Sequence, residues 1–198
     1  MPVNIAIADY GVGNLHSIRK ALELCGADAS VVGMEDILDA ECIVFPGVGA
    51  FSRTMERLLP YRDRIVERLE SGTPCLGICI GAQILFEESA EGSSPGLGFF
   101  EGGVVRLEVD KVPHMGWNLV ESEDPVFDSI GSMYFYFAHS FYGNPSEDVV
   151  IGETEYLVRF PSAFRKGNVI GTQFHPEKSS TSGLTFLGNF VDLAEDCL

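Results

Sequence analysis

The stretch from residue 73 to residue 88 constrains the fold more than any other part of the sequence. Its apolar run at 75–78 predicts a short buried strand, and the helix formers of 82–88 predict the opening of a helix. Between them, residues 77–81 are Gly-Ile-Cys-Ile-Gly, the glycine-x-nucleophile-x-glycine spacing of a nucleophile elbow. Such a turn strains its central residue, and glycines two positions away remove the resulting Cβ clashes. We predict that Cys79 is a nucleophile whose thiolate the helix dipole favours; a buried structural cysteine is the alternative.

Length, charge and cysteine content narrow the class of protein. With 198 residues and 45% hydrophobic content, the chain is expected to form one globular domain over residues 1–198. Its 29 acidic and 13 basic residues give a formal charge of −16, which argues against nucleic acid or an anionic membrane as a partner. Five cysteines without regular spacing predict reduced thiols, and we find no leader sequence or membrane-spanning run. These features predict a soluble protein of the cytoplasm without a structural metal.

Strand and helix patterns alternate from the N-terminus to residue 88. Apolar runs predict strands at 3–8, 29–32, 42–45 and 75–78. Amphipathic spacing predicts helices at 15–25, 51–59 and 61–72, with a short helical turn at 34–40. This alternation predicts an α/β fold with a mostly parallel central sheet and helices on both faces.

The second half of the chain has a different pattern. Short strand-like runs separated by turn residues occupy 104–109, 117–120, 133–139, 149–153 and 158–163. We expect them to form an antiparallel or mixed extension of the sheet. A hairpin turn at 165–168 leads to a last strand at 169–174, and the final helix is expected at 181–195.

A nucleophilic cysteine needs a base, and the base needs an orienting group. Of the four histidines, only His175 ends a predicted strand with an acid, Glu177, two residues later. Residues i and i+2 of an extended segment face the same side, and Pro176 is expected to keep this segment extended. Glu177 can therefore hold one imidazole nitrogen while the other faces Cys79. An ordinary surface His-Pro-Glu turn is the alternative.

Attack by Cys79 creates an oxyanion that needs two N–H donors. The geometry of the elbow offers the N–H of Ile80. The segment Gly47-Val48-Gly49 is the candidate for the second donor, because its glycines let the backbone approach closely and turn a peptide inward. An ordinary glycine-proline turn after a strand is the alternative.

Several motifs together carry a resemblance to a known family. Residues 75–83, Cys-Leu-Gly-Ile-Cys-Ile-Gly-Ala-Gln, and 174–179, Phe-His-Pro-Glu-Lys-Ser, resemble the class I (triad) glutamine amidotransferases. The segments at 9–14, 46–51, 113–118 and 136–140 further resemble the glutaminase subunits of imidazole glycerol phosphate synthases. The similarity covers essentially the whole chain. Two departures are Ala82 and Phe141, where that family usually has a larger residue such as Met and a Tyr.

The resemblance implies a flavodoxin-like amidotransferase fold, no cofactor or metal, and hydrolysis of L-glutamine by a Cys79, His175 and Glu177 triad. It also implies a heterodimer in which ammonia passes to a (β/α)₈-barrel cyclase subunit. That cyclase forms imidazole glycerol phosphate and an aminoimidazole carboxamide ribotide in histidine biosynthesis. The residues implied at the substrate are Gln83, His139, Ser140 and Phe141. Those implied at the partner subunit are Asn14, Met115, Trp117 and Tyr136. For Gln83 the alternative is an exposed helix former, and for Trp117 it is core packing.

Three other functions stay open at this point. A cysteine peptidase or small-molecule hydrolase would share the elbow but would not need the 47–49 segment or a partner surface. A glutaminase of vitamin B6 synthesis would carry a segment resembling Gly-Gly-Glu-Ser after the third strand, where this chain has Pro-Gly-Val-Gly. A non-catalytic binding module would not need a complete triad. Release of glutamate from glutamine, with and without a barrel cyclase, separates these hypotheses.

Overall fold

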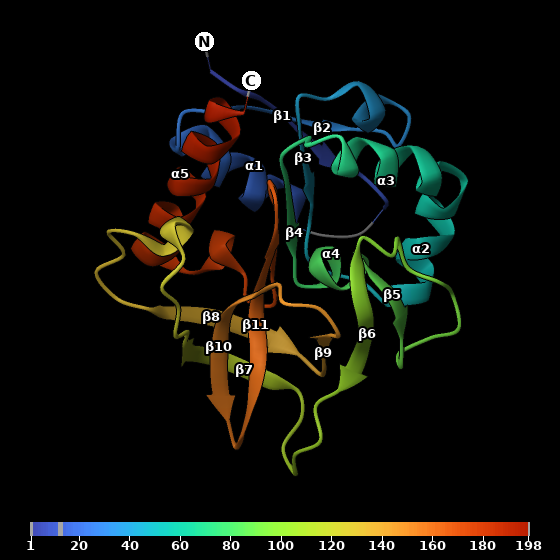
Figure 1. Cartoon of the computed structure of the whole chain (residues 1–198). Coiled ribbons are helices and arrows are strands. Elements are labelled where there is room, and N and C mark those ends of the chain that lie inside the picture. The colour runs from blue at the N-terminus through green and yellow to red at the C-terminus, as the bar shows by residue number, and fades with distance from the viewer. Residues whose placement is uncertain (1, 12–13, 198) are drawn as a thin grey trace.

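The centre of the protein is a seven-stranded sheet, seen in a computed structural model that describes residues 2–11 and 14–197 (Figure 1). Its five parallel strands are Asn4–Ala8 (β1), Asp28–Val32 (β2), Cys42–Phe45 (β3), Cys75–Ile78 (β4) and Val169–Thr172 (β12). They lie in the order β2-β1-β3-β4-β12, and β4 is the middle strand of the whole sheet. The strands β3, β4 and β12 are buried along their entire length, as expected for parallel strands covered on both faces.

Helices cover both faces of this sheet. One face carries Leu15–Leu24 (α1) and Ser180–Asp196 (α5), and the other carries Phe51–Leu58 (α2) and Arg62–Glu70 (α3). Side chains along a strand point alternately to the two faces. In β1, the isoleucines at 5 and 7 pack with α1 and α5, whereas the alanines at 6 and 8 pack with α2 and α3. The predicted α/β fold with helices on both faces of a mostly parallel sheet is confirmed.

Short turns complete the connections. The described residues include four 3₁₀ turns, at Asp36–Asp39 (η1), Leu59–Tyr61 (η2), Pro125–Phe127 (η3) and Pro176–Lys178 (η4). Of these, η1 corresponds to the helical turn expected at 34–40. Within residues 2–11 and 14–197, we find no helix that is long and apolar enough to cross a membrane.

The strands of the second half divide between the main sheet and two smaller ones. Next to β12 and antiparallel to it lies Val158–Lys166 (β11). At the edge of the sheet, Val150–Tyr156 (β10) pairs antiparallel with β11. A separate three-stranded sheet contains Phe86–Ser89 (β5), Phe100–Arg106 (β6) and Phe141–Pro145 (β9). A two-stranded sheet contains His114–Leu119 (β7) and Tyr134–His139 (β8). The predicted extension of the sheet is therefore right for β10 and β11 and wrong for the other strands.

Aromatic packing holds the three-stranded sheet against the main one. The ring of Phe86 on β5 lies 5.4 Å from the ring of Phe100 on β6 and 5.2 Å from that of Phe164 on β11. In β9, Gly143 runs so close to Phe86 that an added Cβ would collide with the ring. The sequence does not predict β9, because Gly143-Asn144-Pro145 has the composition of a turn and becomes a strand only by pairing with β6.

The helix predicted at 82–88 is wrong. The helix after β4 spans only Ile80–Gln83 (α4), and the chain then enters β5 at Phe86. The backbone of Leu85 and Phe86 is held by N–H groups of Phe99 and Gly98, at 2.8 and 3.0 Å. Burial of the Phe86 side chain between sheets and these hydrogen bonds outweigh the helix propensity of the local sequence.

Candidate active site

Cys79 occupies the sharp turn between β4 and α4. Its φ of 51° and ψ of −106° are values that residues other than glycine rarely adopt, and such strain is on the order of 1–3 kcal/mol. A Cβ at Gly77 would collide with the carbonyl of Gly81, and a Cβ at Gly81 would collide with the carbonyl of Phe45. Both glycines are thus required by close backbone packing. The strained elbow predicted from residues 77–81 is present.

His175 lies just beyond β12 and contacts Glu177. Its Nδ1 is 2.9 Å from Oε1 of Glu177, and both side chains are almost fully buried. Because a carboxylate can only accept, Nδ1 donates this hydrogen bond, which leaves Nε2 for proton exchange with Cys79. Among the described residues Nε2 has no hydrogen-bond partner, so it is free for this exchange. One expectation is corrected: Pro176 begins the turn η4, so a tight turn and not an extended segment brings the two side chains together.

The surroundings of His175 favour the protonated, charged form of its imidazole. Burial alone disfavours the imidazolium, but interactions with Cys79 and Glu177 outweigh burial and raise the pKa of His175 to about 9. An adjacent imidazolium stabilises a thiolate. The helix dipole contributes less than predicted, because α4 is a single turn. His175, and not the short helix α4, is therefore the main charged partner of Cys79.

Three adjacent strands bring the site together. Gly47, Cys79 and His175 follow the carboxyl ends of β3, β4 and β12, which are neighbours in the sheet. A Cβ at Gly47 would lie 3.1 Å from Cε1 of His175 and 2.7 Å from the carbonyl oxygen of Ile78. Glycine at this position therefore leaves the room that the imidazole needs.

Two of the four oxyanion candidates, Gly49 and Ile80, line the same cavity as Cys79. Ile80 is the first residue of α4, and the first N–H groups of a helix have no partner within it. Gly49 has a φ of 150°, in a region that side-chain-bearing residues rarely adopt. Gly47 instead packs against the base, and Val48 is 39% exposed and does not line the cavity.

The cavity at Cys79 has a volume of about 240 Å³, which suits a single amino acid. All four residues predicted at the substrate line it, and they come from α4, β8, β9 and the link between β8 and β9. Its lining is completed by Glu91, Pro113, Met115 and Ala138. Among the described residues, no three His, Cys, Asp or Glu side chains gather in a way that could hold a metal ion.

Gln83 and Gln173 connect the cavity wall to the nucleophile. Gln83 is buried, so the alternative of an exposed helix former is wrong. Its Nε2 donates to the carbonyl of Phe141 at 2.8 Å and to Oε1 of Gln173 at 3.0 Å. Nε2 of Gln173 lies 3.6 Å from Sγ of Cys79. The sequence analysis missed Gln173, although a glutamine near the end of an apolar buried strand is a recognisable sign of a buried polar contact.

His139 lines the cavity together with a histidine partner that the sequence analysis also missed. Its Nδ1 lies 2.9 Å from the carbonyl oxygen of Phe141, and its Nε2 lies 3.0 Å from Nδ1 of His114. Burial lowers the pKa of His139 to about 3 and that of His114 to about 4. Both imidazoles are therefore neutral at pH 7.

The sheet of β7 and β8 presents an apolar outer face beside this cavity. We define the β7–β8 patch as the cross-strand pairs on that face, Met115 with Ala138, Trp117 with Tyr136, and Leu119 with Tyr134. Trp117 is 53% exposed and meets the ring of Tyr136 edge-on, so the alternative of core packing is wrong. Since Met115 and Ala138 also line the cavity, the patch reaches the active site.

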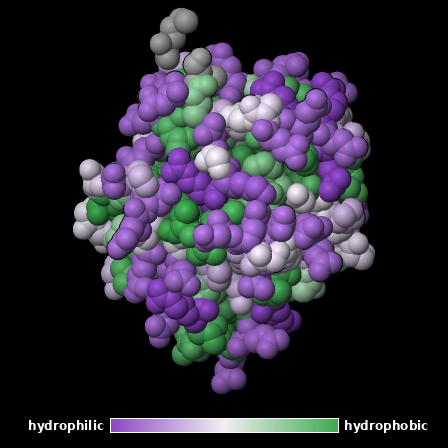
Figure 2. All heavy atoms as spheres, in the orientation of Figure 1, coloured by the Kyte–Doolittle hydropathy of each residue, from purple (hydrophilic) through white to green (hydrophobic). Residues whose placement is uncertain are grey.

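The remaining surface is mainly polar. Hydrophilic residues dominate the face shown in Figure 2, in keeping with a formal charge of −16. Asn14 is exposed at the start of α1, where its side chain caps the helix by accepting from the N–H of Ser17 at 3.2 Å. Capping accounts for this residue type, and a role at a partner stays a prediction. Residues 12 and 13 of the 9–14 motif lie outside the described residues.

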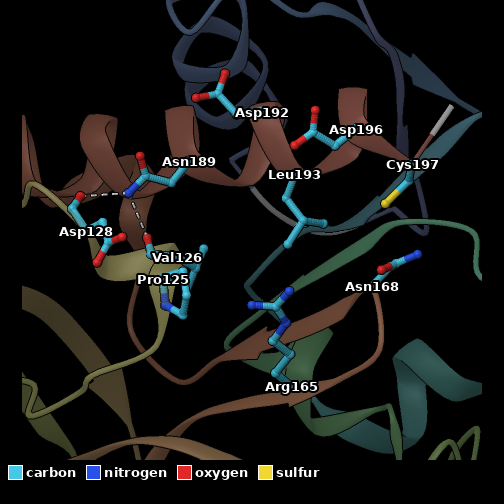
Figure 3. A pocket seen from close by; sticks show the side chains of 10 residues that line it. All are labelled: Pro125, Val126, Asp128, Arg165, Asn168, Asn189, Asp192, Leu193, Asp196 and Cys197. Carbon is cyan, nitrogen blue, oxygen red and sulfur yellow. Dashed lines mark hydrogen bonds between the residues drawn. The ribbon is translucent and has the colours of Figure 1, made fainter.

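A larger cavity, of about 480 Å³, lies between α5 and β11 (Figure 3). Arg165 projects into it from β11, and Asn189 on α5 donates to the carbonyls of Val126 and Asp128 at 2.9 and 2.8 Å. Its other lining residues are Pro125, Asn168, Asp192, Leu193, Asp196 and Cys197. None of the predicted site residues lines this cavity, so the smaller cavity at Cys79 is the candidate active site.

A strained cysteine elbow with a His-Glu pair just beyond the neighbouring strand, in this fold, is the arrangement of a triad amidotransferase. The chain belongs to the class-I glutamine amidotransferase family, whose family model matches residues 6–193. A solved glutamine amidotransferase shares the fold, with a TM-score of 0.75 at 22% identity, covering 96% of this chain and 98% of that one.

Curated relatives identify the group of amidotransferases to which the chain belongs. It is 47% identical over 194 residues to the imidazole glycerol phosphate synthase subunit HisH of Methanocaldococcus jannaschii, covering 96% of this chain and 99% of the relative. It is 48% identical over 198 residues to subunit HisH of Archaeoglobus fulgidus, again covering 96% and 99%. Within the amidotransferases, the chain is thus a member of the HisH group.

Proposed function

We propose that the protein hydrolyses L-glutamine to glutamate and ammonia, with Cys79 as nucleophile, His175 as base and Glu177 as orienting group. The sulfur attacks the side-chain amide carbonyl, and His175 passes a proton to the leaving ammonia. Water then hydrolyses the glutamyl thioester and regenerates the thiol. The observation that best supports this proposal is the strained Cys79 at a cavity lined by all four residues predicted at the substrate.

The proposed oxyanion donors are the N–H of Ile80 and an N–H of the segment that ends at Gly49. The amino-acid end of glutamine would lie against the wall formed by residues 139–141. Gln83 holds this wall, because its amide nitrogen is already committed to Phe141 and Gln173.

We further propose that a barrel cyclase binds the β7–β8 patch and receives the ammonia. The curated relatives are subunits of imidazole glycerol phosphate synthase, which supports a cyclase partner of that kind. Exposed Trp, Tyr and Met side chains are typical of protein interfaces. Because Met115 and Ala138 belong to both patch and cavity, ammonia formed at Cys79 would leave beside the partner. The complex would serve histidine biosynthesis in the cytoplasm.

The test is an assay of the purified chain with and without a barrel cyclase from a HisH-containing organism. Glutamate release and formation of imidazole glycerol phosphate are measured together, with glutamine or ammonium as nitrogen source. We expect glutamine to support the cyclase reaction only when this chain is present, and ammonium to support it in either case. Glutamine turnover that never reaches the cyclase product would contradict the proposed partner.

We predict that the glutaminase is nearly silent alone and is activated about 10²- to 10³-fold by the cyclase with its ligand, the effect of one oxyanion donor. Gly49 can adopt backbone angles that other residues rarely adopt, so we expect its peptide to have two orientations that differ by only a few kcal/mol. Partner contacts can then select the active state. Glutamate release is compared for the free chain, the complex, and the complex with imidazole glycerol phosphate. Equal rates in all three would mean that the oxyanion hole is preformed.

We predict that Trp117→Ala weakens cyclase binding by about 2 kcal/mol, or roughly 30-fold in Kd, without unfolding the chain. The side chain is exposed on the patch, so its loss removes contact area but leaves no cavity in the core. Calorimetric titration against the cyclase measures the change, with circular dichroism to check the fold. Leu24→Ala, which removes an exposed apolar side chain at the far end of α1, is the matched control. Unchanged affinity for the Trp117 variant would exclude the patch as the interface.

A further inference from the structure

Two buried histidines beside the active site have no part in the triad. His114 lies between the rings of Tyr156 and Phe137, with centroids 4.0 and 4.7 Å away in stacked geometry. His139 lies against Phe160, at 5.2 Å between centroids. The two imidazoles are joined by a 3.0 Å contact from Nδ1 of His114 to Nε2 of His139. Neither side chain is more than 5% exposed, so every polar atom of the pair depends on a protein partner.

The direction of hydrogen bonding is set at one end by Asn118. The N–H of Leu119 donates to Oδ1 of Asn118 at 2.8 Å, and Nδ2 of Asn118 lies 2.8 Å from the carbonyl of Glu155. These contacts fix the orientation of the amide, because a backbone carbonyl can only accept. The same Nδ2 lies 3.2 Å from Nε2 of His114. Nε2 of His114 must therefore be the accepting nitrogen, and its proton is on Nδ1.

The Phe141 end of this hydrogen-bond chain is consistent with the same direction of donation. The carbonyl of Phe141 can only accept, so Nδ1 of His139 carries a proton and donates to it at 2.9 Å. Nε2 of His139 then accepts from Nδ1 of His114. The Phe141 end places a proton on Nδ1 of His139, and the Asn118 end makes Nε2 of His114 an acceptor. Together the two ends require two neutral imidazoles with the proton on Nδ1. A neutral pair also avoids a second positive charge near His175, whose charge opposes protonation of His139.

The hydrogen-bond chain from Asn118 ends at the carbonyl of Phe141, which is also linked to Cys79. It accepts from both His139 and Gln83, and Gln83 is connected to Cys79 through Gln173. The preceding carbonyl, of Ser140, accepts from the N–H of Leu107 at 2.9 Å and so points toward β6. In an antiparallel ladder the next residue then turns its N–H and C=O away from β6. The peptides on both sides of Phe141 are therefore fixed in orientation at the cavity.

We propose that His114 and His139 are positioning residues for glutamine, because their one-way hydrogen-bond chain from Asn118 fixes the Phe141 carbonyl and the cavity wall at residues 139–141. This rests on the proposed glutaminase function. The histidines act through the backbone and do not take part in proton transfer. Their loss lets the wall shift relative to Cys79, which weakens substrate binding more than it slows the chemical step.

The first test needs no substitution and no catalysis. Nitrogen-15 NMR of the imidazoles in the wild-type chain, at pH 7.5, reports the tautomer of each histidine. We expect His114 and His139 both to be neutral with the proton on Nδ1, the less common tautomer of free histidine. Exposed His16 is the internal reference and is expected to show the usual mixture. A proton on Nε2 of either buried histidine would overturn the proposed chain.

The second test is kinetic and uses the complex with the cyclase. His114→Phe keeps a ring between Tyr156 and Phe137 but removes the donor to His139. We expect the KM for glutamine to rise about tenfold with kcat changed less than about twofold, as for the loss of binding shared by ground state and transition state. Tyr156→Phe changes the same cluster without touching the hydrogen-bond chain and is the matched control. Alkylation of Cys79 by iodoacetamide is expected to keep its wild-type rate in both variants.

The positioning role of the histidines and the proposed glutaminase function have separate contradicting outcomes. An unchanged KM in folded His114→Phe, an equal rise in Tyr156→Phe, or a fall in kcat without a change in KM would each overturn the positioning role. If His114→Phe does not fold, Asn118→Leu removes the first donor of the chain at a half-buried position, and a smaller rise in KM is expected. Absence of glutamine hydrolysis by the wild-type complex would overturn the proposed function itself, whereas the tautomer assignment stands independently of catalysis.

Discussion

Replacement of Cys79 by alanine is expected to abolish glutamine hydrolysis in the complex, with kcat lowered about 10⁴- to 10⁶-fold, while ammonium still supports the cyclase. The substitution deletes the nucleophile and leaves the partner's own chemistry intact. It also replaces a strained residue at φ 51° with another L residue, so the elbow keeps the same backbone requirement. Glutamate release and ammonium-dependent product formation are measured on the same preparation.

The matched control for this prediction is Cys75→Ala. Cys75 lies on the same strand and is fully buried, and burial raises the pKa of its thiol well above the ordinary value. A thiol in that state is not a nucleophile at neutral pH. We expect the Cys75 variant to keep wild-type glutaminase activity. Near wild-type activity in the Cys79 variant, by contrast, would remove Cys79 from the mechanism.

His175→Ala is expected to lower kcat about 10⁴- to 10⁶-fold, and Glu177→Gln at least about tenfold less. The alanine removes the proton relay. The glutamine can still hydrogen-bond to Nδ1 at the 2.9 Å distance, but as a neutral group it does not stabilise the imidazolium and it can hold the wrong tautomer. Single-turnover glutamate release in the assembled complex gives both values.

The pH profile of the Glu177 variant adds a second measurement. Interactions with Cys79 and Glu177 together raise the pKa of His175 to about 9 against the effect of burial. Loss of the carboxylate charge should therefore move the limb of the kcat profile that reports His175 to lower pH. Glu23→Gln, which neutralises a partly exposed carboxylate on α1, controls for net charge. A larger loss for Glu177→Gln than for His175→Ala would mean that the base is assigned wrongly.

The elements of this protein that follow local rules could be predicted from its sequence. The apolar runs at 42–45 and 75–78 define β3 and β4 to the residue, because buried parallel strands are short continuous apolar runs. The elbow follows from two glycines around Cys79, and the base follows from an acid two residues after His175. Both pairs are close in the sequence, so their contact needs little information from the rest of the chain.

Elements that depend on distant partners could not be predicted in this way. Helix formers at 82–88 favour a helix, yet Phe86 becomes part of β5 because its ring is buried against Phe100 and Phe164. The strand β9 exists only through pairing with β6, and Trp117 is exposed because the alternation of β7 turns it away from His114.

The same distinction applies within the active site. The proposed nucleophile, base and orienting acid could be named from the sequence alone, since glycine spacing, strand burial and the short separation of His175 and Glu177 are local properties. The wall of the cavity was decided by tertiary structure. Gln173 follows β12, Gln83 and Phe141 come from α4 and β9, and His114 and His139 meet only because β7 pairs with β8 in one register. A hydrogen bond between residues 25 to 90 positions apart depends on where the fold places their backbones, and no local pattern records that placement.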